Sequence, residues 1–418
     1  MFTKKLFFPA RILIYVLVVT TVIATVIGTL VLLSSIRQSQ YQLYRDNNDL
    51  MTNLNSGITL LSNINNHTIT TEKIDLFGNQ SDSIFIKKGF WGVYAIGRIT
   101  AVKETLQGNT SLSKDILFGS ELMEEQKAAI YLAGGNKALS VAGKTQIIGD
   151  AYLPNGGIKS ANINGVNYQG SKLLYGDKKN STRFLPPQNE SLIDTVTAYF
   201  NPVIPQTNYE QKRYSFKQAT KIINAENIYL ENKVLKGNLI VKADSTVIIE
   251  SNNDLEDILI VASKIIVKSG FKGSLQLFAT KGIEIESDVH LEYPSAVCLI
   301  KDDPMNQTIQ PIVNIGKRSQ VEGVIWVKEK QINRVKARVN IEEKAIINGQ
   351  VLVDGFVDLK GIVYGNVSCT GFFLKTAASV YENHLFNATI DATQLNKHFL
   401  SHIIYKDAAS NKIIKWLD

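Results

Sequence analysis

Cysteine, histidine and methionine are scarce in this chain of 418 residues, which has 2 Cys, 5 His and 4 Met. Two cysteines cannot make a disulfide framework, and no CxxC pair or HExxH motif occurs. The composition argues against a redox or metal enzyme, and we expect no metal site and no cofactor. Cys298 and Cys369 both lie in apolar runs. This predicts buried, inert thiols, with a disulfide as the alternative if folding brings the two together.

Charge is missing from one long stretch. Residues Ile12 to Ile36 hold no charged side chain across 25 positions. About 20 apolar residues are enough for a helix to cross a bilayer, so this segment predicts a transmembrane helix. Basic residues without acids precede it, which places the N-terminus in the cytoplasm and the rest of the chain outside. A cleaved signal peptide is the alternative, but its apolar core would be shorter, about 7–15 residues. We therefore expect a retained anchor in the cytoplasmic membrane.

An amphipathic stripe follows the anchor and predicts a stalk helix. Its apolar residues recur at steps of three, four and seven; they are Ile36, Leu43, Leu50, Leu54, Ile58, Leu61 and Ile64. Such a stripe either packs on the domain that follows or on a neighbouring copy. Small residues such as Thr21 and Gly28 share one side of the span, which is typical of closely packed membrane helices but also merely tolerated there.

The remaining chain reads as mainly β. We expect a cytoplasmic tip and transmembrane helix over 1–36, a stalk helix over 37–64 and a small β-rich region over 65–129, of which 107–129 is a loop and a short helix. Two apolar, glycine-punctuated stretches, 130–176 and 227–374, flank a proline-rich insertion with one helix, 177–226. Residues 375–418 form a cap, with a capping box at Asp391 that starts a helix and a last strand near Lys412.

The second stretch repeats itself. Segments that begin at Thr246, Lys264 and Gly282 align at a spacing of 18 residues. Fixed self-similarity of this kind is typical of solenoids, so the predicted fold is a parallel β-helix head on an N-terminal transmembrane and stalk helix, with a β-sandwich as the alternative. Glycines fall where corners need positive φ or close backbone approach; they are Gly323, Gly349, Gly355, Gly361, Gly365 and Gly371.

Candidate sites are weak. His398 and His402 are four residues apart on the expected C-terminal helix, but a metal needs three or four ligands, and His67, His290 and His384 stand alone. Acids group at Asp254, Glu256 and Asp257, at Glu284, Glu286 and Asp288, and at Asp302 and Asp303. Glu284 and Glu286 would share one outward face, as in β-helix enzymes that act on polysaccharides. Outward glutamates are common on such a fold, so we assign no catalytic residue.

Basic residues are dispersed, with a net charge of +7. The densest run contains Lys328, Lys330, Arg334, Lys336 and Arg338, and Trp326 is its only neighbouring aromatic residue. Without interleaved aromatics for base stacking, the run indicates a solvated turn, and no nucleic acid partner is expected. Acidic polysaccharide or lipid head groups would also suit this charge.

Two resemblances follow from these segments. A short basic N-terminus, an apolar helix, a polar stalk and a β-rich head resemble the layout of type IV pilins and pseudopilins, although FFPARILIYV lacks that family's glycine and glutamate. The Ile-, Val- and Gly-punctuated segment 227–374 is similar to bactofilins and other polymer-forming β-solenoids, and the whole chain is similar in style to membrane-anchored envelope proteins of Bacteroidetes. These resemblances imply a structural role but assign no functional residue.

The sequence therefore predicts a non-enzymatic, membrane-anchored extracytoplasmic structural or interaction protein of the bacterial cell envelope, such as a minor pilin-like or assembly subunit. Its partners would be the lipid bilayer and other proteins or copies of itself, through the transmembrane and stalk helix. The alternative function is a β-helix that binds or acts on polysaccharide. Catalysis would require Glu284, Glu286 and an acid or base of a neighbouring coil to converge in one groove.

Overall fold

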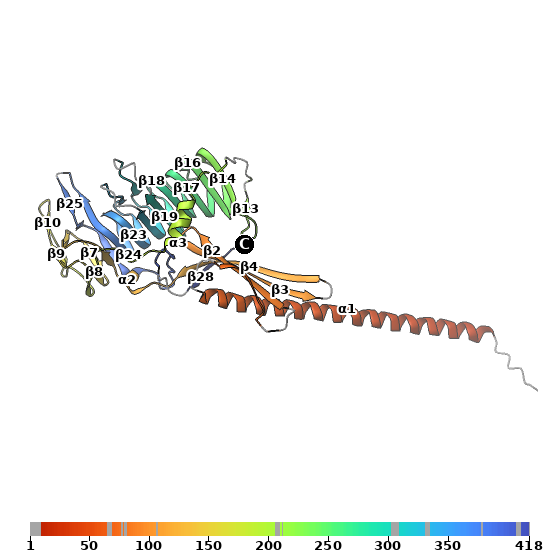
Figure 1. The fold of residues 1–418 in the computed structure, drawn as a ribbon. Coiled ribbons are helices and arrows are strands. Elements are labelled where there is room, and N and C mark those ends of the chain that lie inside the picture. Colours follow the sequence, from red (N-terminus) through yellow and green to blue (C-terminus); the bar gives the residue numbers. More distant parts are fainter. Residues whose placement is uncertain are drawn as a thin grey trace, which may run out of the picture. The chain divides into compact units, whose positions relative to one another are not determined.

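A computed structural model describes residues 10–64, 69–76, 78, 82–105, 108–204, 210, 212–301, 309–330, 335–377, 379–406 and 411–417. The fold is mainly β, with one long apolar helix near the N-terminus (Figure 1). The chain divides into two compact units. Unit 1 contains Met1–Ile58, Glu72–Phe85 and Ile99–Ser113; unit 2 contains Thr59–Thr71, Ile86–Arg98 and Lys114–Asp418.

Helix α1 spans Ala10–Asn63 without a break. It is long and apolar enough to cross a bilayer, since one 18-residue window has a mean hydropathy of 2.7 and none of that window is buried. Leu13 and Tyr15 are each 73% exposed, as side chains that face lipid would be. The predicted anchor and stalk therefore form a single helix, and this helix is compatible with a single-pass membrane anchor.

Within unit 1, the helix packs against strands. Leu50 and Leu54 are buried, and a Cβ added to Gly57 would lie 2.8 Å from Cγ2 of Ile99, so the missing side chain allows close approach. Lys103 Nζ lies 3.0 Å from Asp46 Oδ1 and 2.5 Å from Asp49 Oδ2. This part of the predicted stripe packs on strands of the same chain, while Leu43 is 62% exposed.

Five strands form one sheet in the order β1-β2-β3-β4-β28. Strands β1, β2, β3 and β4 contribute residues to both units. The strands are β1 (Ile69–Ile74), β2 (Asp82–Trp91), β3 (Tyr94–Thr105), β4 (Gly108–Ser120) and β28 (Asn411–Leu417). The expectation of a loop over the first part of 107–129 was wrong, because Gly108–Ser120 is a strand; the short helix is α2 (Glu124–Lys127). The predicted last strand is confirmed as β28, which pairs antiparallel with β4.

Unit 2 is dominated by a large sheet of mostly parallel strands that closes on itself. Figure 1 shows several of these strands side by side, coloured from green to blue. In chain order they are β13 (Arg213–Tyr214), β14 (Lys221–Leu230), β15 (Val234–Gly237), β16 (Leu239–Ile249), β17 (Asp254–Val267), β18 (Lys272–Ile285), β19 (His290–Lys301), β20 (Ile312–Ile315), β21 (Gln320–Glu329), β22 (Arg338–Ile341), β23 (Ile346–Leu359) and β24 (Ile362–Lys375).

The 18-residue repeat is confirmed in the register of this sheet. Thr246 pairs with Lys264, and Lys264 pairs with Gly282. Repeated positions therefore lie directly above one another in neighbouring strands. One such column is apolar and fully buried along the stack, and it contains Val247, Ile265, Ile283, Val313, Val339, Val357 and Phe372. Each side chain of this size contributes about 1.5–3 kcal/mol on burial, so the repeat itself builds the core.

Glycines line up as predicted. Gly323, Gly349 and Gly365 are successive register partners, with φ of +139°, +148° and +143°. A Cβ on Gly349 would lie 1.9 Å from the carbonyl oxygen of Gly323, and one on Gly365 would lie 1.9 Å from that of Gly349. Only glycine tolerates both the backbone conformation and the approach.

The earlier β stretch does not precede β13 in space. Its first strand, Ile130–Leu132, pairs in parallel with β24, which is the last of the main-sheet strands in chain order. The strands are β5 (Ile130–Leu132), β6 (Leu139–Ala142), β7 (Gln146–Ile148), β8 (Ala151–Leu153), β9 (Ile158–Ser160), β10 (Asn162–Ile163), β11 (Val166–Asn167) and β12 (Lys178–Asn180). The chain then leaves β12 and returns to begin the main sheet at β13. This return contains α3 (Glu190–Ala198), the helix expected in the 177–226 insertion.

The expected C-terminal helix is absent from residues 379–406. This part holds β25 (Val380–Glu382), β26 (His384–Phe386), β27 (Thr389–Asp391) and one 3-10 turn, Ala392–Gln394. The Asp391 side chain does accept a hydrogen bond from Thr393 N at 2.9 Å, so the capping signal was real. The turn ends at once, and Ile403 is buried among neighbouring elements instead of on an amphipathic helix.

The two cysteines are free and buried. Cys298 is in register with Trp326, whereas Cys369 pairs with Val353 and Leu132. Three strand spacings separate Cys298 from the strand of Cys369, and each spacing is about 4.8 Å. A disulfide needs Cα atoms within about 7 Å, so the alternative of a bridge is wrong.

Candidate functional site: a basic cleft

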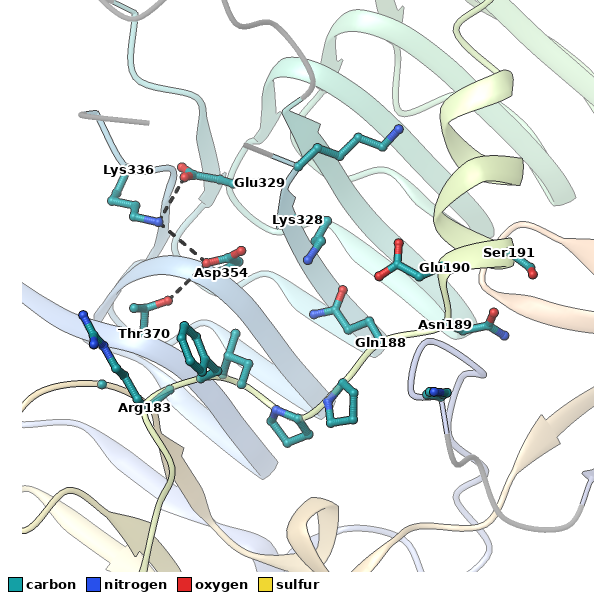
Figure 2. A pocket seen from close by; sticks show the side chains of 18 of the residues that line it. Arg183, Gln188, Asn189, Glu190, Ser191, Lys328, Glu329, Lys336, Asp354 and Thr370 are labelled. Carbon is teal, nitrogen blue, oxygen red and sulfur yellow. Dashed lines mark hydrogen bonds and ion pairs between the residues drawn. The ribbon is translucent and has the colours of Figure 1, made fainter. Parts of the chain in front are cut away.

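A cleft of about 900 Å³ opens on unit 2, at one corner of the main sheet. Val327, Val353, Cys369 and Leu132 are successive register partners, and the residue after each of them lines the cleft. Those residues are Lys328, Asp354, Thr370 and Ala133. Figure 2 shows three of them on neighbouring strands. One wall is therefore a column of side chains held by strand register.

The opposite wall is the segment 183–191, part of the return from β12. Two consecutive prolines, Pro186 and Pro187, fix its backbone dihedral φ and stiffen it. The segment is pinned by backbone hydrogen bonds: Asn189 N donates to Ile404 O at 2.7 Å, and Lys406 N donates to Pro187 O at 3.0 Å. The wall then continues into the first turn of α3, where the Asn189 side chain accepts from Leu192 N.

A buried carboxylate anchors the floor. The Glu329 side chain is 1% exposed; its Oε1 accepts from Ala337 N at 2.6 Å and its Oε2 lies 3.2 Å from Lys336 Nζ. Lys336 also lies 3.8 Å from Asp354 Oδ1, and Thr370 Oγ1 donates to the same oxygen at 3.4 Å. Figure 2 draws these contacts as one chain across the floor. Lys336, Glu329 and Asp354 thus neutralise much of one another's charge.

A buried amide faces the cleft. Gln188 is 8% exposed, and its Oε1 accepts a hydrogen bond from Trp326 Nε1 at 3.3 Å. An indole nitrogen can only donate, so this contact fixes the orientation of the amide and directs Nε2 away from Trp326. Among the described residues, this Nε2 donates to no group. Figure 2 shows the Gln188 side chain pointing from the segment into the cleft.

Positive charge is in excess at this site. The charged lining residues are Arg183, Lys328, Lys330, Lys336 and Lys406 against Glu190, Glu329 and Asp354. Arg183, Lys328 and Lys406 form no ion pair within the part of the chain that the structure describes, and the same is true of Glu190. Beside them Phe184 is 73% exposed, with the Arg183 guanidinium 6.0 Å from its ring centroid.

A second groove of about 630 Å³ lies on another part of unit 2, and each of its carboxylates has a basic side chain as its partner. Its carboxylates belong to Asp254, Glu256, Glu292 and Glu322. Their partners are Lys236 at 2.7 Å, Lys415 at 2.6 Å, Lys272 at 3.1 Å and His290 at 3.0 Å, respectively.

The pKa values near this second groove follow from its pairing. The hydrogen bond from Lys415 lowers the pKa of Glu256, and burial raises the pKa of the neighbouring Asp257. Because each carboxylate that lines the groove already has a basic side chain as its partner, the second groove has the character of a structural polar network.

The acidic residues singled out in the sequence do not meet in one place. Glu284 Oε2 accepts from Asn314 at 2.7 Å, while Glu286 pairs with Lys268 at 2.7 Å and Asp288 with Arg318 at 2.5 Å. None of these three lines either groove. Asp254 and Glu256 line the second groove. Asp302 and Asp303 fall outside the described residues.

The histidine pair is also separated in environment. His398 is exposed, whereas His402 is 2% exposed and burial lowers its pKa to about 3. His402 Nδ1 accepts from Ile404 N at 3.1 Å, and no helix aligns the two rings. His67 falls outside the described residues. His384 bonds to a backbone carbonyl, and His290 contacts Glu322. Among the described residues, no group of three or more possible metal ligands occurs.

The described residues of the basic run do not all lie at one site. Lys328, Lys330 and Lys336 line the cleft, whereas the Arg338 guanidinium lies 5.1 Å from the Phe373 ring centroid. Arg334 falls outside the described residues. Sequence reasoning missed Arg183, Phe184 and Gln188, which come from the insertion. The signal was the Pro-Pro pair next to a cation, an aromatic residue and an amide, but nothing in the sequence says which strands they face.

Comparison with known proteins gives no assignment: no family model, no curated protein and no solved structure matches this chain.

Proposed function

We propose that this chain is a membrane-anchored interaction protein of the bacterial cell envelope, without catalytic activity of its own. The observation that carries the proposal is the exposed apolar stretch of α1, none of whose most apolar window is buried. Two basic residues, Lys4 and Lys5, precede the span, and the positive-inside rule then puts unit 2 on the extracytoplasmic side of the cytoplasmic membrane.

The head is proposed to be a parallel β-helix. In its support, strands from β14 to β24 pair in parallel with the next strand or the next but one, and the 18-residue repeat coincides with the register. Polar residues also stack along one outer column, where Asn340 donates to Asn314 at 2.6 Å and Asn314 donates to Glu284 at 2.7 Å. Self-association of the pilin-like or bactofilin-like kind would use the exposed face of α1 that includes Leu43.

Carbohydrate binding is the second candidate, favoured by the cleft that unit 2 carries. Its catalytic version has no support, because Glu284 and Glu286 are paired apart from both grooves. Binding without catalysis is the form that agrees with the proposed interaction role.

The test is membrane extraction with protease protection. We expect the native protein to resist alkaline carbonate, to dissolve in detergent and to lose unit 2 to external protease in spheroplasts. A protein that carbonate releases, or a unit 2 that is cut only after lysis, would contradict the anchor or its orientation. Crosslinking before solubilisation then tests self-association; a strictly monomeric species would remove the assembly role.

A further inference from the structure

We propose that the basic cleft binds an acidic oligosaccharide, a short run of sugar rings that carry carboxylates. This inference rests on the proposed function, because it names the ligand of the interaction head. The site is built from Arg183, Phe184 and Gln188 on the return segment and from Lys328 and Thr370 on the sheet.

The donors of the cleft demand a ligand that is rich in acceptors. Gln188 Nε2 is held as a donor because Trp326 occupies the oxygen of the same amide. Gln188 Nε2 is therefore available to donate to a ligand oxygen in the cleft, in place of a water molecule. Lys328 and Arg183 add charge-assisted donors, for which carboxylate oxygens are strong acceptors.

A saccharide suits the remaining surface better than a small inorganic anion. The cleft lies at the upper end of the range of about 300–1,000 Å³ for small-molecule sites, so a single phosphate would leave most of it open. Phe184 presents an exposed ring beside Arg183, and an aromatic face next to polar groups is the surface on which a sugar ring stacks. The proline pair keeps this ring on a stiff wall.

One carboxylate works against the ligand. Glu190 lines the same cleft and has no ion pair among the described residues. It therefore lowers the affinity for an anion, and its neutralisation has the opposite effect from neutralisation of Lys328. This pair of opposite signs distinguishes a bound anion from a neutral sugar.

The experiment is calorimetric titration of the full-length protein in detergent with trigalacturonate, with maltotriose as a neutral trisaccharide and with inorganic phosphate. We expect trigalacturonate to bind, and maltotriose and phosphate to bind at least tenfold more weakly. Lys328→Gln should weaken trigalacturonate binding roughly tenfold and Phe184→Ala roughly fivefold, whereas Glu190→Gln should tighten it about threefold. Lys272→Gln in the second groove is the matched control, with no effect.

Four results would overturn the proposal: no trigalacturonate binding, equal binding of maltotriose, equal binding of phosphate, or insensitivity to both Lys328→Gln and Glu190→Gln. The first result would rule out this ligand, and the second would show that its charge is not recognised. The third would show that its sugar rings are not recognised, and the fourth that it does not bind in this cleft. Since the titration is done in detergent, its failure leaves the anchor untouched, and a failed carbonate test leaves the cleft untouched. The substituted side chains are on the surface, so loss of the fold does not confuse the result.

Discussion

The basic cleft and the second groove lie on the same parallel sheet, and charged residues line both of them. Only the cleft has charged side chains without an ion-pair partner among the described residues. In the second groove each carboxylate is paired, for example Glu292 with Lys272 at 3.1 Å and Asp254 with Lys236 at 2.7 Å. In the cleft, Arg183 and Lys328 form no ion pair among the described residues. The difference is in the origin of the walls.

Both walls of the second groove come largely from neighbouring strands, where side chains in nearby register sit about 4.8 Å apart. Opposite charges at such positions meet and cancel. The cleft has only one such wall, and its other wall is the return segment 183–191, which no strand register matches to the sheet. The stacked strands of the second groove pair their own charges, whereas in the cleft the return segment brings Arg183 opposite Lys328, and neither of the two has an ion pair among the described residues. Four predictions test this contrast.

The largest effect should come from acid. Because burial lowers the pKa of His402 to about 3, the unfolded chain binds a proton between pH 6.5 and 3 that the native chain does not. The free energy of unfolding therefore falls as the pH drops through this window, by about 1.4 kcal/mol per unit and about 3 kcal/mol at pH 4. His402 lies next to Ile404, which pins the cleft wall. His402→Asn should flatten this slope, as measured by urea unfolding at several pH values.

Asp257, beside the second groove, supplies the contrasting control. Its pKa is raised by burial, so the native state holds a proton more tightly than the unfolded chain, and its contribution to stability falls as the pH rises above 3.8. Asp257→Asn should therefore make the acid loss steeper where His402→Asn makes it shallower. Slopes that change in the same direction would contradict both assignments.

Next in size is a matched pair of charge removals. Glu329→Gln takes a carboxylate from a position where its side chain is 1% exposed, beside Lys336, and we expect a loss of about 2 kcal/mol. Glu292→Gln removes a carboxylate that is 44% exposed and should cost less than about 0.5 kcal/mol. Chemical denaturation measures both. Equal costs would show that burial does not decide how much each carboxylate contributes to stability.

A smaller effect is expected from Trp326→Phe. The change leaves the Gln188 carbonyl without its donor, at a cost of about 1–2 kcal/mol, and frees the amide to present its oxygen to the cleft. Stability should fall slightly while trigalacturonate binding weakens several-fold. If stability falls but binding is unchanged, the oriented amide has no role in the cleft.

The smallest effect is that of salt on stability. The ion pairs of the second groove are partly exposed and contribute about 0–1 kcal/mol each, so 0.5 M NaCl should lower the melting temperature by no more than a few degrees. Trigalacturonate binding at the cleft should weaken strongly over the same range. If the affinity of the cleft for trigalacturonate did not change with salt, charge would not drive the binding.

Much of the fold could be predicted from the sequence, because it depends on a local repeat. The 18-residue spacing of Thr246, Lys264 and Gly282 became strand register, and the glycine positions became close backbone contacts. The continuous apolar run became a single helix. The prediction of a C-terminal helix was wrong, because Asp391 caps only one turn. The backbone amides of Ser401 and Ile403 then donate to carbonyl groups elsewhere in the chain, those of Ser120 and Val93.

The cleft could not be predicted from the sequence, because it is formed by parts of the chain that no sequence repeat relates to one another. Lys328 was noticed as part of a basic run, but a run does not reveal that Gln188 and Phe184 lie opposite. Gln188 and Trp326 are 138 residues apart in sequence. Similarly, nothing local in Ile130–Leu132 says that its partner is β24 and not the strand next in order.

That last pairing has a consequence for how the polypeptide matures. Asn366 Nδ2 donates to Ala128 O at 2.6 Å, across 238 residues. During synthesis the segment that starts near Ala128 leaves the ribosome long before the strand that completes it. Until then its edge has no partner, and loop closure over such a distance is slow. Strand β24 therefore completes the fold of a segment that was synthesised much earlier. A chain that terminates before β24 leaves β5 without its partner strand, so we expect cells to degrade truncated chains instead of using them as functional fragments.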